Sequence, residues 1–317
     1  MEGASQPGHD RKTEGFGKDA FGRTFVGLQT IASIMQRLML PRPVNRRVFL
    51  VSMAVAGLAL PLEGQEAAKR MIVIDPGHGG KNDEADSGST AAENRSDANH
   101  AALIGDASVK ERLLTLELSK KIAASIAAKS KENGQTVDCV LTRTQDDQNP
   151  DFTQRMATAA EAHASLVISI HFNSGEVRSS NGPVCMYPRA AVNPHLERDE
   201  KVAKALAETV RKTTLAFEEP GFTTHSACFD DQDLVDRNEH GKQVRPHGSY
   251  LFYQARNNPT LRDVTVLYLE VDYLQSKLYQ ERSRKLFVDR KAEVFQAWAD
   301  AIAGELISQA TAMEKKE

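Results

Sequence analysis

The feature that most constrains the fold is an alternation that begins at Met71, where short apolar runs of strand length are followed by longer stretches with helical periodicity. This alternation is typical of α/β domains with a largely parallel sheet. Runs such as Leu166–Ile170 suit strands that helices cover on both faces. We therefore predict a single α/β domain whose mostly parallel, twisted sheet of about six strands is flanked by helices on both faces. The predicted strands are Met71–Asp75, Thr136–Arg143, Leu166–His171, Pro183–Tyr187, Ser249–Gln254 and Val264–Glu270.

Four stretches carry helical patterns. The first ends before Gly134, a residue typical of helix C-termini. Residues 81–107 and 217–246 do not fit the alternation, and we predict that both are long surface insertions. The predicted helices are Val109–Asn133, Asp151–His163, Arg198–Leu215 and Phe287–Leu306.

Residues 1–70 are predicted to be an N-terminal extension that carries an export signal. No acidic residue occurs between positions 20 and 62, and arginines precede the apolar run at 48–62. This run is too short to cross a bilayer as a helix, and Asn45–Leu50 (NRRVFL) resembles the twin-arginine signal. An ordinary secretory signal and a buried amphipathic helix are the alternatives. The catalytic domain is then expected at 71–310, followed by a tail at 311–317.

Charge and cysteine content exclude two classes of protein. The 40 Lys+Arg and 43 Asp+Glu residues give a net charge of -3, so the chain lacks the cationic surplus that nucleic-acid binding needs. We expect no nucleic-acid partner. The three cysteines, at 139, 185 and 228, show no metal-binding spacing and are too few for a disulfide framework. They leave room for one disulfide or none.

Three of the predicted strands end at a residue that can bind a metal or transfer a proton. His78 follows the first strand in a glycine-rich turn, His171 ends the third, and Glu270 ends the last. Because the carboxyl ends of strands form the ligand crevice of open α/β sheets, we expect these side chains to converge there.

Glu111, at the start of the first long helix, is a fourth candidate with two interpretations. With Ser108 it matches a capping box, in which the glutamate bonds back to the helix N-terminus. It also lies on the same helical stripe as Leu114 and Leu118, so its carboxylate is expected to point inward. A buried carboxylate needs compensation, which a divalent cation would supply.

Two imidazoles and one carboxylate are a ligand set found in zinc hydrolases. Zinc lowers the pKa of a bound water to about 7 and polarises a scissile carbonyl. Glu270 would then serve as the general base that takes the proton from the water and delivers it to the leaving nitrogen.

These residues lie in motifs that resemble the zinc-dependent N-acetylmuramoyl-L-alanine amidases of the amidase-3 type. The resemblance covers residues 71–308. It implies one zinc ion per chain, held by His78, Glu111 and His171, with Glu270 as catalytic acid/base. The motifs are IDPGHGG at 74–80, the helix start at Glu111, VLTRTQD at 140–146, Gln154-Arg155, SIHFNS at 169–174 and LYLEVDYL at 267–274.

The resemblance also implies lesser roles for four residues. Asn173 would line the site, while Arg143 and Arg155 would support it or else form surface ion pairs. Asp272 departs from the family pattern; it would hydrogen-bond near the zinc or perturb Glu270 by charge repulsion.

A peptidoglycan hydrolase is the function that the resemblance implies. It would cut the amide between N-acetylmuramic acid and L-alanine in the periplasm or cell envelope, after passage through the export machinery. The sequence does not identify a protein activator. Two alternatives stay open: a zinc peptidase or amidohydrolase that acts on another amide, and a noncatalytic wall-binding protein with an amidase fold.

Overall fold

The computed structural model describes residues 70–80, 101–104, 107–174, 181–234, 249–275 and 280–314. All of them lie in the compact unit Gln65–Glu317. The predicted export signal and most of the insertion at 81–107 lie outside the described residues. Within the described residues, no helix has the length and apolar character needed to cross a membrane.

The centre of the domain is a six-stranded sheet with the order β4-β1-β5-β8-β6-β7. Neighbouring strands run parallel except β6, which is antiparallel to β8. The predicted fold class, an α/β domain with a mostly parallel sheet of about six strands, is confirmed. The strands are β1 (Arg70–Pro76), β4 (Val137–Leu141), β5 (Leu166–Ser174), β6 (Val184–Tyr187), β7 (Ala227–Asp230) and β8 (Thr265–Gln275).

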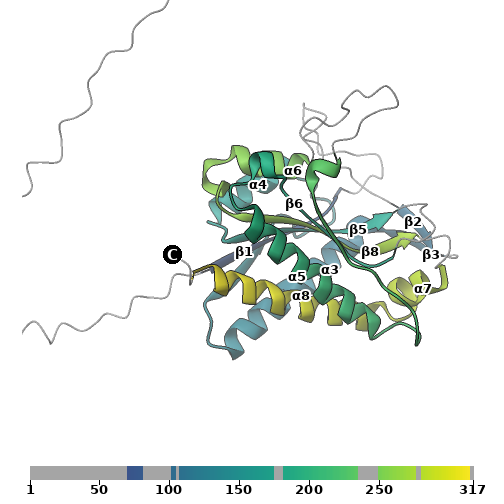
Figure 1. The fold of residues 1–317 in the computed structure, drawn as a ribbon. Coiled ribbons are helices and arrows are strands. Elements are labelled where there is room, and N and C mark those ends of the chain that lie inside the picture. Colours follow the sequence, from purple (N-terminus) through teal and green to yellow (C-terminus); the bar gives the residue numbers. More distant parts are fainter. Residues whose placement is uncertain are drawn as a thin grey trace, which may run out of the picture. The chain divides into compact units, whose positions relative to one another are not determined.

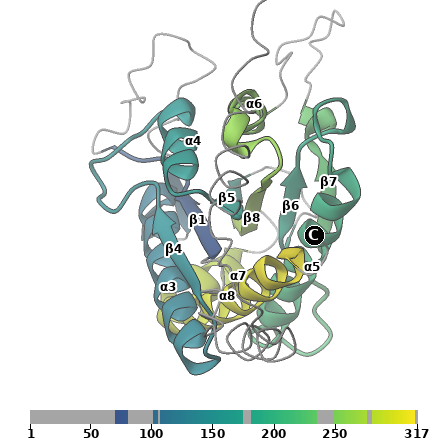
Figure 2. The same ribbon diagram turned by 90° about the vertical axis from the view of Figure 1, so that its left-hand side faces the viewer.

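Helices cover both faces of this sheet (Figures 1 and 2). One face carries α3 (Glu111–Glu132), α5 (Leu196–Leu215) and α8 (Lys291–Glu314). The other face carries α4 (Phe152–Glu161) and α6 (Tyr250–Asn257). Alternate side chains of a strand contribute to the hydrophobic cores on the two faces of the sheet. In β1, Ile72 and Ile74 pack against the first group of helices, and Val73 packs on the opposite side.

Smaller elements connect these layers. Strands β2 (Ala101–Ile104) and β3 (Ala107–Lys110) form an antiparallel pair just before α3. Helix α8 continues to Glu314, so the residues predicted as a tail are helical at their start. The remaining short elements are η2 (Ala190–Val192), η3 (Asp231–Leu234), η4 (Pro259–Leu261), α7 (Gln280–Arg284) and the π-helical turn η5 (Lys285–Asp289).

Two predictions of secondary structure are wrong. The segment Ser249–Gln254 was expected to be a strand, but it starts helix α6, whose Leu251, Phe252 and Ala255 are buried on one side. A short apolar run is compatible with either element, and packing against the sheet decides. The segment 217–246, predicted as a surface loop, contains among its described residues the edge strand β7, which pairs with β6.

Helix termini follow local sequence signals in two of three cases. Helix α3 ends before Gly134, which has a φ of 61°, and α4 begins with a capping box formed by Asp151 and Gln154. The capping box expected at Ser108 is wrong, because Ser108 pairs with Leu103 in the β2–β3 ladder. Helix α3 therefore begins at Glu111 without a side-chain cap.

The end of β5 is anchored by an aromatic core. Phe172 is 1% exposed and packs against Phe287, Phe295 and Trp298. Because Phe172 follows His171, this packing fixes the strand at the point where the candidate site begins. None of the three cysteines forms a disulfide.

Candidate metal centre

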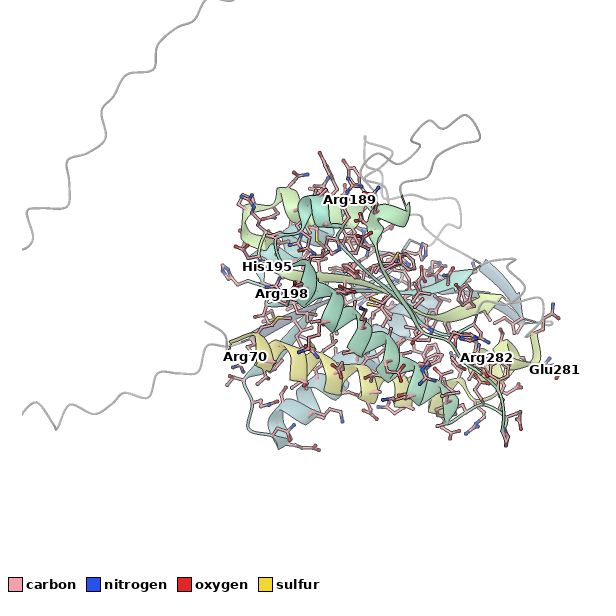
Figure 3. The ribbon with its side chains drawn as sticks, in the orientation of Figure 1. Arg70, Arg189, His195, Arg198, Glu281 and Arg282 are labelled. Carbon is pink, nitrogen blue, oxygen red and sulfur yellow. The ribbon has the colours of Figure 1, made fainter. Side chains whose placement is uncertain are left out.

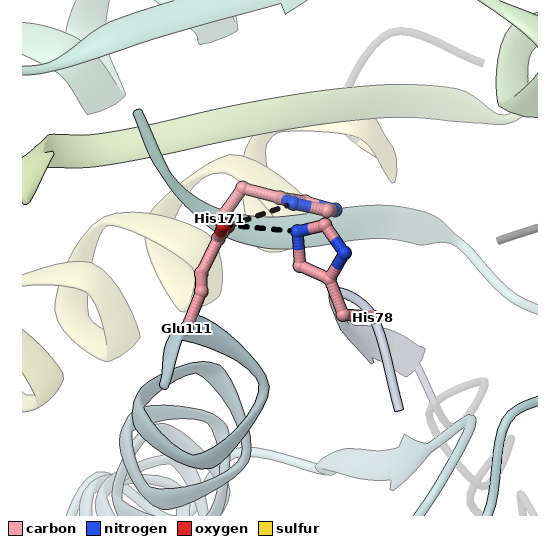
Figure 4. A group of neighbouring side chains, drawn as sticks. All are labelled: His78, Glu111 and His171. Atoms are coloured by element: carbon pink, nitrogen blue, oxygen red, sulfur yellow. Dashed lines mark hydrogen bonds and ion pairs between the residues drawn. The ribbon is translucent and has the colours of Figure 1, made fainter. Parts of the chain in front are cut away.

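His78, Glu111 and His171 meet at the carboxyl edge of the sheet (Figure 4). The Nε2 atom of His78 lies 3.0 Å from Oε2 of Glu111, and Nδ1 of His171 lies 3.2 Å from Oε1 of the same carboxylate. One donor atom from each residue lies within 4.8 Å of the others. The predicted convergence of these side chains is therefore observed.

Two buried arginines hold the turn that carries His78. Arg155 donates from Nη2 to the backbone carbonyl of His78 at 2.8 Å. Arg143 donates from Nη2 to the carbonyl of Gly77 at 2.8 Å and from Nε to that of Pro76 at 3.0 Å. Both arginines are 1% exposed, so the alternative of surface ion pairs is wrong. They fix a turn in which His78 has a left-handed φ of 58°.

Asp75 compensates the charge of Arg155. The two side chains form a buried ion pair, and Ser169 donates to Oδ2 of Asp75 at 2.6 Å. Burial alone would raise the pKa of Asp75, but the charge of Arg155 and hydrogen bonds from Ser169, Thr142 and Arg155 together lower it. This carboxylate ties the end of β1 to α4 beneath the His78 turn.

The absence of a side chain at Gly77 makes room for His171. A Cβ atom at position 77 would lie 2.3 Å from Cε1 of His171 and 2.4 Å from Nε2. The backbone at Gly77, directly after β1, thus approaches the imidazole ring more closely than any other residue type allows. The glycine before His78 is a packing requirement of the site.

Glu111 is 3% exposed and sits at the first position of α3. The backbone N–H of Phe172 donates to its Oε1 at 2.9 Å. Burial opposes ionisation, but the charge of His78 and the hydrogen bonds with both histidines outweigh it and hold the pKa of Glu111 well below its usual range. For His171, burial is the largest effect and lowers its pKa. A neutral imidazole is the form that binds metals.

Glu270 lies beside this cluster, because it is the register partner of His171 in the β5–β8 pair. Burial and the negative charge of Glu111 raise the pKa of its carboxyl group well above the usual range. Its Oε2 atom is buried without a hydrogen-bond partner among the described residues. Such an orphaned oxygen is uncommon in folded proteins and often marks a functional position.

Tyr268 is a residue of the site that was not predicted from the sequence. Its ring stacks on the imidazole of His171, with centroids 4.3 Å apart and planes 15° from parallel. Hydrogen bonding with Tyr268 lowers the pKa of Glu270, although burial and the charge of Glu111 outweigh this effect. The available signal was period-two alternation, which places Tyr268 on the same face of β8 as Glu270.

The structure does not bring Asp272 into the cluster. This fully buried carboxylate is paired with Arg282 of α7, labelled in Figure 3, through bonds of 2.9 and 2.6 Å, and it accepts the N–H of Gly182 at 3.0 Å. Arg282 also donates to Glu218 at 2.6 Å. The network joins β8 to α7 and to the segments beside β6 and α5. Asn173 lies half-buried on β5, two residues beyond His171.

The donor set of the cluster fits a metal ion. Tetrahedral ligands about 2.0–2.2 Å from zinc lie about 3.3–3.6 Å apart, which is close to the 3.0 and 3.2 Å separations between Glu111 and the two histidines. A cation would also compensate the buried negative charge of Glu111, next to which Glu270 adds a second carboxyl group. The three residues are a group that can hold a metal ion.

Fold and site together define an α/β protein with a buried His-Glu-His group at the carboxyl edge of its sheet. Residues 72–228 match the model of the Amidase_3 family, described as N-acetylmuramoyl-L-alanine amidase. The match includes His78, Glu111 and His171 and supports the assignment of the chain to this family. Comparison with curated protein sequences gives no significant match.

Solved structures of amidases are similar to the chain at low sequence identity. The amidase AmiC2 of Nostoc punctiforme is 22% identical, with 75% of this chain and 96% of that chain covered and a TM-score of 0.44. Ami1 of Mycobacterium smegmatis is 18% identical, with 77% and 97% covered and a TM-score of 0.48. The CwlD amidase of Clostridioides difficile, solved in complex with the GerS lipoprotein, is 17% identical, with 77% and 100% covered and a TM-score of 0.47.

Proposed function

We propose that the protein is a zinc-dependent amidase that hydrolyses the bond between N-acetylmuramic acid and the L-alanine of peptidoglycan stem peptides. The observation that carries this proposal is the buried group of His78, Glu111 and His171 next to Glu270. The Amidase_3 match supports the substrate class. In this proposal, the three grouped residues hold one zinc ion per chain.

Each residue of the site has a defined part in this reaction. When bound, the zinc ion polarises the scissile carbonyl and makes a coordinated water more acidic. Glu270 accepts the proton of the attacking water at Oε2, which has no hydrogen-bond partner among the described residues, and passes it to the leaving nitrogen. Arg143 and Arg155 keep the His78 turn in place, and Asn173 contacts the substrate beside His171.

Digestion of purified sacculi by the full-length protein tests the proposal. We expect mass spectrometry of the products to show stem peptides that begin with a free L-alanine, together with glycan strands whose lactyl groups are intact. Chelation should abolish the release and added zinc should restore it. The variant His171→Ala should lose both zinc and activity.

Two other outcomes would assign a different function. Cleavage at another amide would make the protein a zinc peptidase or amidohydrolase of another specificity. Binding to sacculi without release of peptides would make it a noncatalytic wall-binding protein. The departure from the family pattern at Asp272 is the sequence feature that favours the second alternative, but its ion pair with Arg282 gives Asp272 a structural role.

The proposed substrate lies outside the cytoplasm, and we infer that the chain acts in the periplasm or cell envelope. Residues 1–70 would then be the export signal, and residues 71–310 the catalytic domain. Fusion of residues 1–70 to a reporter that is active only after folded export would test the twin-arginine route. Replacement of Arg46 and Arg47 by lysine should stop that export.

A further inference from the structure

We propose that Tyr268 is a positioning residue that fixes the His171 ring and the Glu270 carboxyl group relative to each other. The inference rests on the proposed function, in which His171 binds the metal and Glu270 transfers the proton. Tyr268 lies in the motif LYLEVDYL at 267–274, but the resemblance implies no role for it, and it does not lie at the end of a predicted strand. Its role follows from its contacts.

The β5–β8 ladder places Tyr268 between the two groups. Ser169 pairs with Tyr268 and His171 pairs with Glu270, so all four side chains leave the same face of the sheet. The tyrosine ring lies flat against the imidazole, with centroids 4.3 Å apart and planes 15° from parallel. The imidazole also meets His78 edge-on, with centroids 4.9 Å apart. Rotation of the His171 ring is therefore blocked by Tyr268.

The hydroxyl group of Tyr268 reaches the second partner. Hydrogen bonding with Tyr268 lowers the pKa of the Glu270 carboxyl group, against the larger effect of burial. Oε2 of Glu270 is buried without a partner among the described residues and stays available for a proton. A single side chain thus couples the orientation of a metal ligand to that of the acid/base, through two separable contacts.

The two contacts can be removed one at a time. Tyr268→Phe keeps the stacked ring and loses the hydrogen bond, whereas Tyr268→Leu loses both. Tyr187→Phe is the matched control, because it removes a hydroxyl from another buried tyrosine on β6, whose side chain packs in the core on the opposite face of the sheet. Three quantities are measured for each full-length variant: zinc affinity by competition with a chromogenic chelator, kcat and KM on a soluble muropeptide, and the melting temperature.

We expect Tyr268→Phe to bind zinc as tightly as the wild type and to keep its KM, while kcat falls about tenfold. Tyr268→Leu should show the same loss of kcat and, in addition, zinc affinity weakened about tenfold, since groups that orient a metal ligand typically contribute 10–100-fold. Tyr187→Phe should match the wild type in zinc affinity and kcat. A general loss of stability would not lower kcat in both variants while weakening zinc binding in Tyr268→Leu alone.

Wild-type kcat in Tyr268→Phe, or wild-type zinc affinity in Tyr268→Leu, would overturn the inference. Losses in both variants that only follow the melting temperature would overturn it as well. The zinc measurement needs no substrate, so the failure of the proposed function is distinguishable: a wild-type protein that binds no zinc and releases no peptide would refute the amidase proposal itself.

Discussion

His171 and Glu270 are direct register partners on β5 and β8, so an imidazole and a carboxyl group project side by side from one face of the sheet. His78 reaches the same place from the turn after β1, and Glu111 reaches it from the start of α3. The strands fix the first pair by their ladder, whereas the other two residues depend on the buried contacts of Arg155 and Phe172. The contribution of each residue to the proposed reaction can therefore be tested with a separate variant.

The first prediction concerns Glu270. Glu270→Gln keeps the size of the side chain and removes its ability to accept a proton. We expect hydrolysis of muropeptides to fall about 10²–10⁴-fold, the usual contribution of a general acid/base, while elemental analysis still finds one zinc per chain. Glu293→Gln, on the exposed side of α8, is the control and should leave both unchanged. Full activity in Glu270→Gln would contradict the assigned role.

The second prediction concerns Gly77. In Gly77→Ala the new methyl group would lie 2.3 Å from the His171 ring, so the imidazole must move away from Glu111. We expect zinc affinity to weaken about tenfold or more, as when the support of a ligand is lost. Isothermal titration with Zn²⁺ checks this.

Gly304→Ala is the matched control for this substitution. Position 304 lies within α8, and a Cβ there would have no neighbour within 4 Å. The change should leave zinc affinity unaltered and stabilise the fold by about 0.5–1 kcal/mol through helix propensity. Unchanged zinc binding in both variants would mean that the close approach at Gly77 does not matter for the site.

The third prediction concerns pH. The pKa of Asp75 is lower in the folded state than its ordinary value of 3.8. Its stabilising contribution is therefore fully present above pH 3.8 and is lost as the pH falls through the folded-state pKa. Asp75→Asn should cost about 3–5 kcal/mol near neutral pH, as for a buried ion pair broken on one side.

This deficit should shrink as the pH falls from 3.8 through the lower folded-state pKa, because the unfolded chain takes up a proton at Asp75 before the folded protein does. Urea unfolding of both proteins across the acid range measures it. Asp138→Asn on the exposed side of β4 is the control. A deficit that stays constant down to the lowest pH would show that the charge of Asp75 contributes nothing.

The sheet and most of its helices could be predicted, because strands that are buried on both faces have continuous apolar runs in the sequence. The strands β1, β5 and β8 are such runs; His171 and Glu270 lie within β5 and β8, and His78 lies two residues after β1. Helix α6 could not be recognised in this way, since its side chains Leu251 and Phe252 suit a strand equally well. The edge strand β7, with sequence ACFD, is too short to show a strand pattern and forms through pairing with β6.

The site was predictable to the same extent. Residues at strand ends converge by topology, so His78, His171 and Glu270 could be named from sequence alone. Tyr268 could not, because its function depends on which residue of β5 lies opposite it. The surroundings of Asp272 were equally hidden, because one of its partners, Gly182, is 90 residues distant in the chain.

The last prediction concerns this Asp272 network. Asp272 is fully buried and accepts hydrogen bonds from both Nη atoms of Arg282. Arg282→Met would leave that carboxylate without a compensating charge and should reduce the free energy of unfolding by about 3–5 kcal/mol. Because Asp272 does not join the metal group, the zinc content of the folded variant should stay at the wild-type value.

A double variant completes this test. Addition of Asp272→Asn to Arg282→Met removes the uncompensated charge, so part of the lost stability should return, as expected for residues in direct contact. Chemical denaturation of the single and double variants gives the coupling between the two positions. If Arg282→Met instead folds with wild-type stability but loses turnover, then Asp272 acts in catalysis, and the structural role assigned to its ion pair is refuted.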